Sequence, residues 1–433
     1  MTAGSRPPSF SWYPFFWWTL AFAALGAPLL LSTYQSNLAG DESAFYLPAI
    51  ARIRAHWPQL DLVGDSLSAT APGYPYVLAT LSFLTGPSVF ALRAINWLVS
   101  LGTLALLWLT LQHRGGTGAT LALAPLALSN FFIKSSCWVV TDNAALLATT
   151  SALLALTFRP PATGLRAGAA AAGVAVMLRQ VSIWLAAPLA WRIWSEVRRR
   201  RTFRPMFWLL CPLVPLVWMI SVWHGLVPPA WQQEQVAEGG FSTTPIIYFC
   251  VVLLSLGLPF YLAITTAEER RHDFRRPWIW ALGAVVLLLV LTSSTTSDHD
   301  AGRWGGYWWS LGARLPTFGR VSLVFLLLAP CGAGLGGALV RRLCLTAGRA
   351  RGLFWLGMLL SWLATTLVNR MVFQRYFEPP VLVFLICWLA LLLEARPESR
   401  LLRRWPLVVL ALGQFALTLL TAHAQAYGLV HFE

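Results

Sequence analysis

Residues 12–42 read WYPFFWWTLAFAALGAPLLLSTYQSNLAGDE, a long apolar run followed by two adjacent carboxylates. The run Trp12–Leu31 contains no charged residue, and about 20 such residues in a helix cross the hydrocarbon core of a bilayer. Arg6 precedes the run, and positive charge beside a first span tends to stay in the cytoplasm. We therefore expect Asp41 and Glu42 on the other side of the membrane, where ionised groups beside lipid are costly and mark functional positions.

The whole chain has the composition of an integral membrane protein. Of its 433 residues, 57% are hydrophobic and 11% are charged, and the mean hydropathy is +0.62. A soluble chain would carry roughly a quarter charged residues. No stretch is polar enough to form a separate soluble domain, so residues 1–433 are expected to form one membrane domain. The first apolar run lacks a small-residue cleavage site, so it is expected to remain as a span.

The net charge of +15 does not indicate nucleic-acid binding. Nucleic-acid binders gather basic residues on one solvated face, whereas the arginines here form short runs between apolar segments, as in cytoplasmic loops. The densest run, residues 198–201, is expected to contact anionic lipid headgroups. The six cysteines are scattered without metal-ligand spacing and are expected to be buried free thiols.

A threading with about thirteen spans places every dense arginine run on the cytoplasmic side. In this threading residues 32–88 form a long first outer loop that carries interfacial helices. The apolar stretch 73–86 is too short to span and is expected to form an interfacial or re-entrant helix. Residues 120–134 are expected to form the third span. The polar residues that remain all fall on the non-cytosolic side: Asp41, Glu42, Asp142, Arg179, Gln180, Asp298, His299, Asp300, Arg303, Arg375 and Glu378.

Carboxylates and arginines on one outer face fit sugar transfer from a lipid phosphate. The lipid tail of such a donor stays in the membrane, while its phosphate and sugar project at the rim of the bundle. An inverting transfer needs a carboxylate to accept the proton of the acceptor hydroxyl, and it needs cations beside the departing phosphate, for which the guanidinium fork is suited. The sequence has no glycine-rich loop of the kind that binds nucleotide phosphates.

Several motifs resemble the GT-C superfamily of membrane glycosyltransferases, and most closely its dolichyl-phosphate-glucose α-1,2-glucosyltransferases. The shared motifs are DESAFYLPAIAR (41–52), SATAPGYPYVLA (68–79), Leu92-Arg93 with Asn96, Phe131 to Asp142, MLRQVSIW (177–184), DHDAGRWGGYWW (298–309) and QRYFEPPVLVF (374–384). The resemblance covers most of the chain. The loop VWHGLVPPAWQQEQVAEGG (222–240) departs from the family pattern, which leaves the acceptor open.

The resemblance implies a GT-C-type helical bundle and an inverting transfer of a hexose, in this family glucose. The donor would be a polyprenyl-phosphate sugar such as dolichyl-phosphate glucose, and the acceptor a glycan or a lipid-linked oligosaccharide. The reaction would take place on the lumenal or periplasmic face, in the endoplasmic reticulum or a bacterial inner membrane. No cofactor would be required, although His299 and Asp300 could ligate a divalent ion.

The site residues implied are two catalytic acids and eight substrate contacts. Asp41 would be the general base, or else a loop acid or helix cap. Glu42 would be a second catalytic acid that binds a metal or the acceptor, or else a helix cap. The substrate contacts would be Asp142, Arg179, Gln180, His299, Asp300, Arg303, Arg375 and Tyr376, with an arginine among them holding the donor phosphate. Asp142 could instead favour a helix N-terminus, Arg303 could pair with Asp300, and Arg179 and Arg375 could be interface anchors.

A transporter or a flippase for lipid-linked sugars is the alternative from another class. Transporters place charged sites near the bilayer midplane, commonly with repeat symmetry between two halves. The polar residues of this chain fall at one rim, and no repeat is visible. The sequence therefore favours the transferase.

Overall fold

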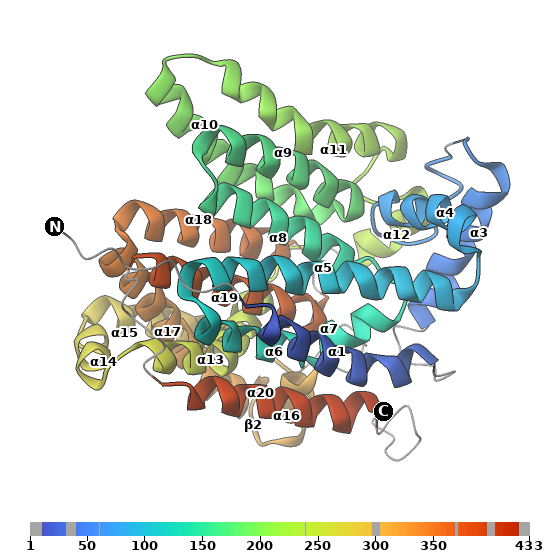
Figure 1. Cartoon of the computed structure of the whole chain (residues 1–433). Coiled ribbons are helices and arrows are strands. Elements are labelled where there is room, and N and C mark those ends of the chain that lie inside the picture. Colours follow the sequence, from blue (N-terminus) through green and yellow to red (C-terminus); the bar gives the residue numbers. More distant parts are fainter. Residues whose placement is uncertain are drawn as a thin grey trace.

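The fold is a bundle of roughly parallel helices, as a computed structural model shows (Figure 1). The structure describes residues 11–31, 40–59, 61–238, 240–296, 304–368, 371–395 and 403–423. Within these ranges, eight helices are long and apolar enough to cross a membrane, or up to ten if each of two bent helix pairs is one span. The predicted all-α, polytopic membrane architecture is confirmed, whereas the expected total of about thirteen spans stays a prediction.

The eight long helices differ mainly in how deeply they are buried. They are α1 (Tyr13–Leu31), α5 (Val89–Gly115), α9 (Pro161–Leu178), the segment 204–223 with α11 (Leu210–Trp223), α13 (Thr244–Ile264), α17 (Leu323–Ala347), the segment 374–395 with α19 (Glu378–Ala395), and the segment 405–423 with α20 (Trp405–Thr418). Of the 18 most apolar consecutive residues in the segment that contains α19, 89% are buried. In the segment that contains α11, only 17% of the corresponding residues are buried. The core therefore surrounds α19.

The predicted third span is wrong as a single helix. Residues 117–137 form three short pieces, η2 (Thr117–Leu123), α6 (Ala124–Ala127) and α7 (Asn130–Cys137). The Ser129 side chain accepts a hydrogen bond from Phe132 N–H and so begins a new helix within the apolar stretch. The next helix, α8 (Asp142–Phe158), is bent by 115° relative to α7.

The remaining elements are short or connect the long helices. They are η3 (Gln180–Leu185), α10 (Ala186–Arg200), η4 (Arg204–Leu209), α12 (Pro229–Glu238), α14 (Ala267–Phe274), α15 (Pro277–Thr292), α16 (Tyr307–Arg314), α18 (Arg349–Thr366), η5 (Gln374–Tyr376) and η6 (Leu419–His423), with strand β1 (Trp304–Gly305) parallel to β4 (Val372–Phe373) and β2 (Thr317–Phe318) antiparallel to β3 (Val321–Ser322).

The first outer loop forms the short helices that its sequence predicts. They are η1 (Glu42–Tyr46), α3 (Leu47–His56) and α4 (Gly73–Thr85), and the 13 residues of α4 are too few to cross a bilayer. Helices α3, α4 and α12 lie at one end of the bundle (Figure 1). A side chain at Gly73 would collide with the main-chain oxygen of Met177, so glycine allows α4 to begin against the end of α9.

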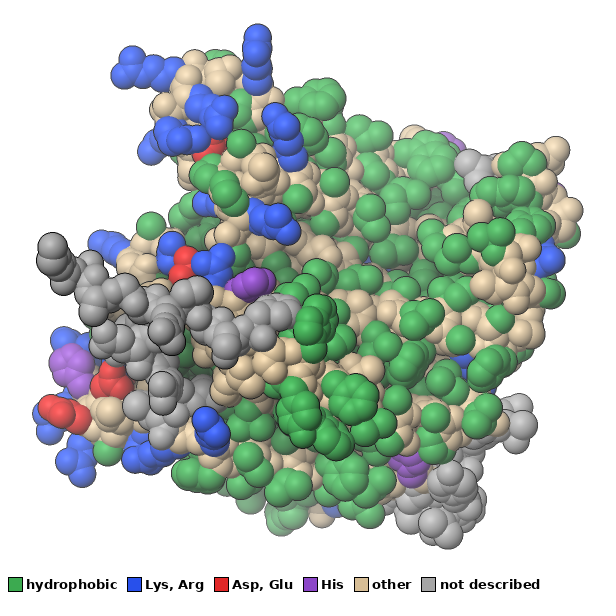
Figure 2. Space-filling view, viewed as in Figure 1, with side chains coloured by type: hydrophobic (Ala, Val, Ile, Leu, Met, Phe, Trp, Pro, Cys, Tyr) green, Lys and Arg blue, Asp and Glu red, His purple; other side chains and the backbone are tan. Residues whose placement is uncertain are grey.

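The arginine-rich helix ends gather at the opposite end of the bundle. Figure 2 shows Lys and Arg side chains concentrated there on the visible face, away from α3, α4 and α12. Arg114 at the end of α5 and Arg351 in α18 both pair with Glu394 at the end of α19, at 3.1 and 3.5 Å. Arg342 in α17 pairs with Asp273 in α14 at 2.7 Å. The structure thus separates the basic helix ends from the first outer loop, as the threading requires.

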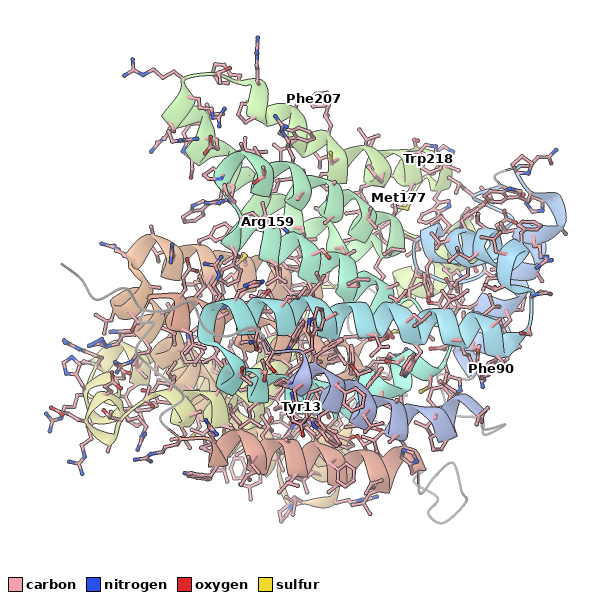
Figure 3. The ribbon with its side chains drawn as sticks, in the orientation of Figure 1. Tyr13, Phe90, Arg159, Met177, Phe207 and Trp218 are labelled. Carbon is pink, nitrogen blue, oxygen red and sulfur yellow. The ribbon has the colours of Figure 1, made fainter. Side chains whose placement is uncertain are left out.

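Apolar side chains cover the flanks between these two ends. Phe207 and Trp218 lie along the outer edge of the segment 204–223, Tyr13 lies on another part of the flank, and Phe90 lies at the end of α5 near α3 and α4 (Figure 3). All four are exposed in the isolated chain. A soluble protein rarely leaves so many large apolar side chains uncovered, so this flank is the surface that faces lipid.

Candidate functional site

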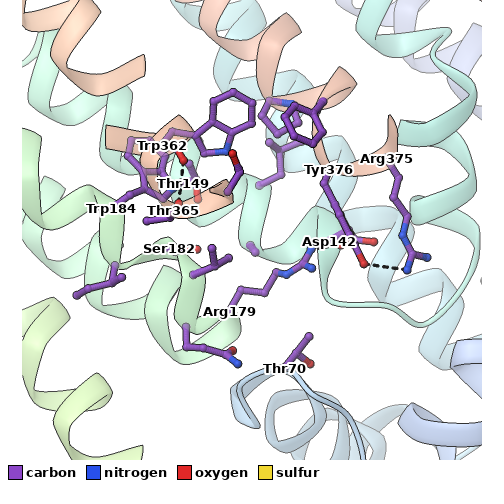
Figure 4. A pocket seen from close by; sticks show the side chains of 18 of the residues that line it. Thr70, Asp142, Thr149, Arg179, Ser182, Trp184, Trp362, Thr365, Arg375 and Tyr376 are labelled. Carbon is purple, nitrogen blue, oxygen red and sulfur yellow. Dashed lines mark hydrogen bonds and ion pairs between the residues drawn. The ribbon is translucent and has the colours of Figure 1, made fainter. Parts of the chain in front are cut away.

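A cavity of about 440 Å³ lies among α8, η3, α18, α19 and the first outer loop. One end of it is polar, with Thr70, Asp142, Arg179, Arg375 and Tyr376 in its wall. The opposite end is apolar and includes Trp184, Trp362, Leu153 and Phe384. Figure 4 shows Asp142, Arg179, Arg375 and Tyr376 pointing toward one another, with Trp184 and Trp362 apart from them. The cavity can therefore hold a molecule with a charged group and an apolar group.

Asp41 joins this polar end through an ion pair. Its Oδ2 lies 3.1 Å from Arg375 Nη1, while Arg375 Nη2 donates to the Tyr376 hydroxyl at 2.9 Å. Asp41 lies beside the cavity rather than in its wall, as the described residues outline it. The third guanidinium donor, Arg375 Nε, is buried and has no hydrogen-bond partner among the described residues. A buried N–H without a partner is costly, and a bound anion would satisfy it.

Asp142 and Arg179 form a second ion pair in the same place. The Arg179 guanidinium lies 4.7 Å from the centre of the Tyr376 ring, and the Arg375 guanidinium lies 5.0 Å from it. The Tyr376 ring therefore contacts both cations. Although burial lowers the pKa of Arg179, this pKa lies above its ordinary value because Asp142 and Tyr376 are adjacent. Both guanidinium groups are permanently charged.

The local structure explains why these side chains meet. Asp142 is the first residue of α8, directly after the 115° bend, where a carboxylate is also favoured by the helix dipole. Arg179 follows the last residue of α9 in an extended conformation, with φ −149° and ψ 114°. Arg375 and Tyr376 lie in η5, which follows strand β4. The site is thus built from breaks between helices that far-apart parts of the sequence supply.

Glu42 has surroundings quite unlike those of its neighbour Asp41. It is buried, and its two oxygens accept hydrogen bonds from Arg93 Nε at 2.9 Å and from Arg93 Nη2 at 2.6 Å. Its Oε1 also accepts from Val139 N–H at 3.3 Å, in the turn between α7 and α8. Glu42 therefore connects the outer loop to α5 and to the bend that presents Asp142. Its predicted catalytic role stays a prediction.

Gln180 and Tyr46 hold the outer loop against the cavity. Gln180 Nε2 donates to the main-chain oxygens of Ala69 at 2.7 Å and Leu226 at 3.3 Å. The Tyr46 hydroxyl lies 3.3 Å from the hydroxyls of both Thr70 and Thr141. These bonds place the segment around Thr70 on the cavity wall.

A capping role for Asp41 finds no support, because its side chain makes no capping hydrogen bond.

Three predicted site residues, His299, Asp300 and Arg303, lie outside the described residues. The first described residue after them, Trp304, pairs through its backbone with Val372, which is three positions before Arg375. Within the described ranges, no three His, Cys, Asp or Glu side chains form a group that could hold a metal ion.

The bend between α7 and α8 is held by Asn96, which belongs to a shared motif but was assigned no role from the sequence, and by Asn143, which was missed. Asn96 Nδ2 donates to the main-chain oxygens of Ser135 at 2.7 Å and Trp138 at 2.5 Å. Asn143 Nδ2 donates to the Phe132 oxygen and the Ser136 hydroxyl, at 2.9 and 2.8 Å. A signal was present, because a carboxamide inside an apolar span needs partners in the protein. The apolar end of the cavity, with Trp184 and Trp362, was also missed, since tryptophans are frequent throughout the chain.

Comparison with known proteins leaves the family open. No protein-family model matches this sequence, and no curated protein matches it. The solved structures that are similar include two of ArnT from Cupriavidus metallidurans, each over 89% of this chain at 13% identity. The structure bound to undecaprenyl phosphate has a TM-score of 0.42 with 77% of its chain covered, and the apo structure has 0.37 with 78% covered. These TM-scores are too low for the similarity to support a fold or an activity for this chain.

Proposed function

We propose that the chain is a GT-C-type inverting glycosyltransferase. It transfers a hexose, in the resembled family glucose, from a polyprenyl-phosphate donor to a glycan or lipid-linked acceptor. One observation carries the proposal: two arginines and two carboxylates converge at the polar end of a cavity whose other end is apolar. The apolar end suits the isoprenoid units next to the donor phosphate.

Arg375 and Arg179 are the proposed phosphate contacts. Guanidinium groups bind phosphate oxygens through paired N–H donors, and Arg375 has a buried Nε–H to offer. When the bond between the sugar C1 and the phosphate oxygen breaks, negative charge collects on the phosphate. The two cations stabilise that charge in a partly dehydrated site. Asp142, held by Arg179, would accept hydrogen bonds from sugar hydroxyls.

Asp41 is the proposed base. In the structure its carboxylate is bound to Arg375. A donor phosphate would compete for the same guanidinium and so release Asp41. The free carboxylate would then accept the proton of the acceptor hydroxyl while the hydroxyl oxygen attacks C1 from the face opposite the phosphate. Donor binding and base activation are thereby linked through one arginine, and Glu42 would position the loop that carries Asp41.

The reaction is assigned to the non-cytosolic face. The end of the bundle where arginines gather would face the cytoplasm, as positively charged loops do, and Asp41 lies in the loop on the opposite side. The endoplasmic reticulum and a bacterial inner membrane both fit this orientation.

The direct test is transfer by the purified protein. We expect incubation with polyprenyl-phosphate glucose and a panel of glycan and lipid-linked acceptors to yield a glucosylated product with the inverted anomeric configuration. Arg375→Ala should abolish it. Absence of transfer to every acceptor, combined with movement of the lipid-linked sugar across proteoliposome membranes, would replace this proposal by the flippase alternative.

A second prediction concerns Arg179. Arg179→Lys keeps the charge but loses the planar fork between Asp142 and Tyr376. We expect the KM for the donor to rise about tenfold, equivalent to about 1.4 kcal/mol, with a smaller change in kcat. Arg199→Lys is the matched control, because Arg199 is an exposed arginine paired with Glu196 at the basic end. An unchanged donor KM for Arg179→Lys would remove Arg179 from the phosphate site.

A further inference from the structure

Glu378 is a buried acid that the proposed reaction does not use. It is the first residue of α19 and is 1% exposed. Its Oε1 accepts from the Ser129 hydroxyl at 2.6 Å, and its Oε2 accepts from Gln374 Nε2 at 2.7 Å. The Gln414 amide provides a further side-chain hydrogen bond. Each of these donors is uncharged. An acid at this depth in a membrane protein is costly and calls for a functional reason.

On one side, Glu378 holds the turn that carries the proposed phosphate ligands. Gln374 is buried, and its Oε1 accepts from the Tyr248 hydroxyl at 3.1 Å and from Tyr307 N–H at 2.8 Å. A side chain at Gly306 would collide with Gln374, so the chain at Gly306 packs directly against this side chain. The next two residues in the turn are Arg375 and Tyr376. The Gln374 side chain therefore ties the buried side of η5 to Tyr248, Tyr307 and Glu378.

On its other side, Glu378 holds the start of the helix that leads to Asp142. Ser129 donates its hydroxyl proton to Glu378 and accepts Phe132 N–H at 3.3 Å, so that it caps α7. Helix α7 runs into the bend from which Asp142 begins α8. One carboxyl group thus connects two segments that are 249 residues apart in sequence. Each segment leads to one member of an ion pair of the site, Asp142 in one case and Arg375 in the other.

We propose that Glu378 is a positioning residue that sets the separation between the two halves of the site. It acts through hydrogen bonds to Ser129 and Gln374, and it does not contact substrate. This inference rests on the proposed function for its kinetic consequences, but the hydrogen-bond arrangement itself can be tested without any substrate.

The arrangement allows an exchange of the two side chains that keeps the hydrogen bonds. In the double variant Gln374→Glu with Glu378→Gln, Glu at 374 can accept from the Tyr248 hydroxyl and from Tyr307 N–H, and its other oxygen can accept from the new amide at 378. The carbonyl oxygen of that amide can still accept from Ser129. In the single variant Gln374→Glu, two carboxyl oxygens would face each other at about 2.7 Å, where like charges repel.

The kinetic test compares four variants of the full-length protein. We expect Gln374→Glu and Glu378→Leu each to lower kcat/KM by at least about tenfold, the scale of one buried hydrogen bond to a charged group. Glu378→Gln should cost less than either, because its amide can accept from Gln374 and donate to Ser129. The double exchange should return kcat/KM to within about threefold of the parent protein. The proposal would be overturned if the double variant had no higher kcat/KM than Gln374→Glu, or if Glu378→Leu kept the kcat/KM of the parent protein.

The structural test is hydrogen–deuterium exchange without substrate. We expect Glu378→Leu and Gln374→Glu to speed exchange in both peptides 130–137 and 372–377, and the double exchange to restore protection in both. Restoration in only one peptide would show that Glu378 does not connect the two segments. If the parent protein transfers no sugar, the proposed function fails, whereas this measurement still decides whether Glu378 holds the site together.

Discussion

Replacing Asp41 by Asn is expected to lower kcat by about 10²- to 10⁴-fold, the usual contribution of a general base. The carboxamide cannot accept the proton of the acceptor hydroxyl. The same change removes the carboxylate anion that pairs with Arg375. We therefore expect the KM for the polyprenyl-phosphate donor to stay constant or fall while kcat falls steeply. Steady-state kinetics with varied donor at saturating acceptor would measure both quantities.

Asp61→Asn is the matched control for Asp41→Asn. Asp61 lies in the same outer loop, and its Oδ1 accepts from the backbone N–H groups of Val63 and Gly64, at 3.1 and 2.8 Å. An asparagine oxygen can accept the same bonds, so this variant should transfer sugar at close to the parent rate. If Asp41→Asn kept the parent kcat, another group would be the base. A rise in donor KM would contradict competition between Asp41 and phosphate for Arg375.

Replacing Glu42 by Leu is expected to cost about 3–5 kcal/mol of folding free energy, the scale for breaking a buried ion pair on one side. The side chain of Arg93 is only 13% exposed and would be left without its carboxylate. We expect a lower midpoint of thermal unfolding in detergent and a loss of transfer, because the turn at Val139 loses its contact with the outer loop. Unfolding curves of the purified variants would show the difference.

Two further variants test whether the loss of stability comes from breaking the ion pair between Glu42 and Arg93 rather than from mutation in general. The double variant Glu42→Leu with Arg93→Leu removes both charges and should recover part of the lost stability. Glu394→Gln disrupts a partly exposed cluster with Arg114 and Arg351 at the basic end, and such pairs contribute about 0–1 kcal/mol. If Glu42→Leu were no less stable than Glu394→Gln, the pair between Glu42 and Arg93 would not hold the loop.

These two predictions assign different roles to the adjacent acids Asp41 and Glu42. Asp41 and Glu42 share a position in the loop, and their sequence context alone is compatible with catalysis by either. In the structure Glu42 is 2% exposed and is held by hydrogen bonds from Arg93 and from Val139 N–H, whereas the Asp41 side chain is 33% exposed and pairs, among the described residues, with Arg375, from which a ligand can displace it. Exposure and an exchangeable partner distinguish a candidate base from a structural acid.

The sequence alone determined the class of fold and the separation of the arginine-rich helix ends from the first outer loop (Figure 2). Apolar runs must become helices in a membrane, because a helix satisfies every backbone group of the segment, and arginine runs mark the helix ends that stay together. These are local properties, readable from residues 12–31 or 198–201 without knowledge of any neighbour. For the same reason the short helix at 73–85 was predicted correctly, since its length decides that it cannot span.

Only the tertiary structure decided which breaks between helices meet. Asp41 and Arg375 are 334 residues apart, and nothing in either motif specifies the other as its partner. In lipid, apolar helices choose neighbours by close packing of small residues and by a few buried polar contacts. A side chain at Gly332 would collide with the backbone of Cys250, and Glu378 joins Ser129 to Gln374. Such contacts bring the bend at Asp142, the end of α9 and the turn at Arg375 to one cavity. The sequence does not show these contacts, because they depend on packing between apolar spans of similar composition.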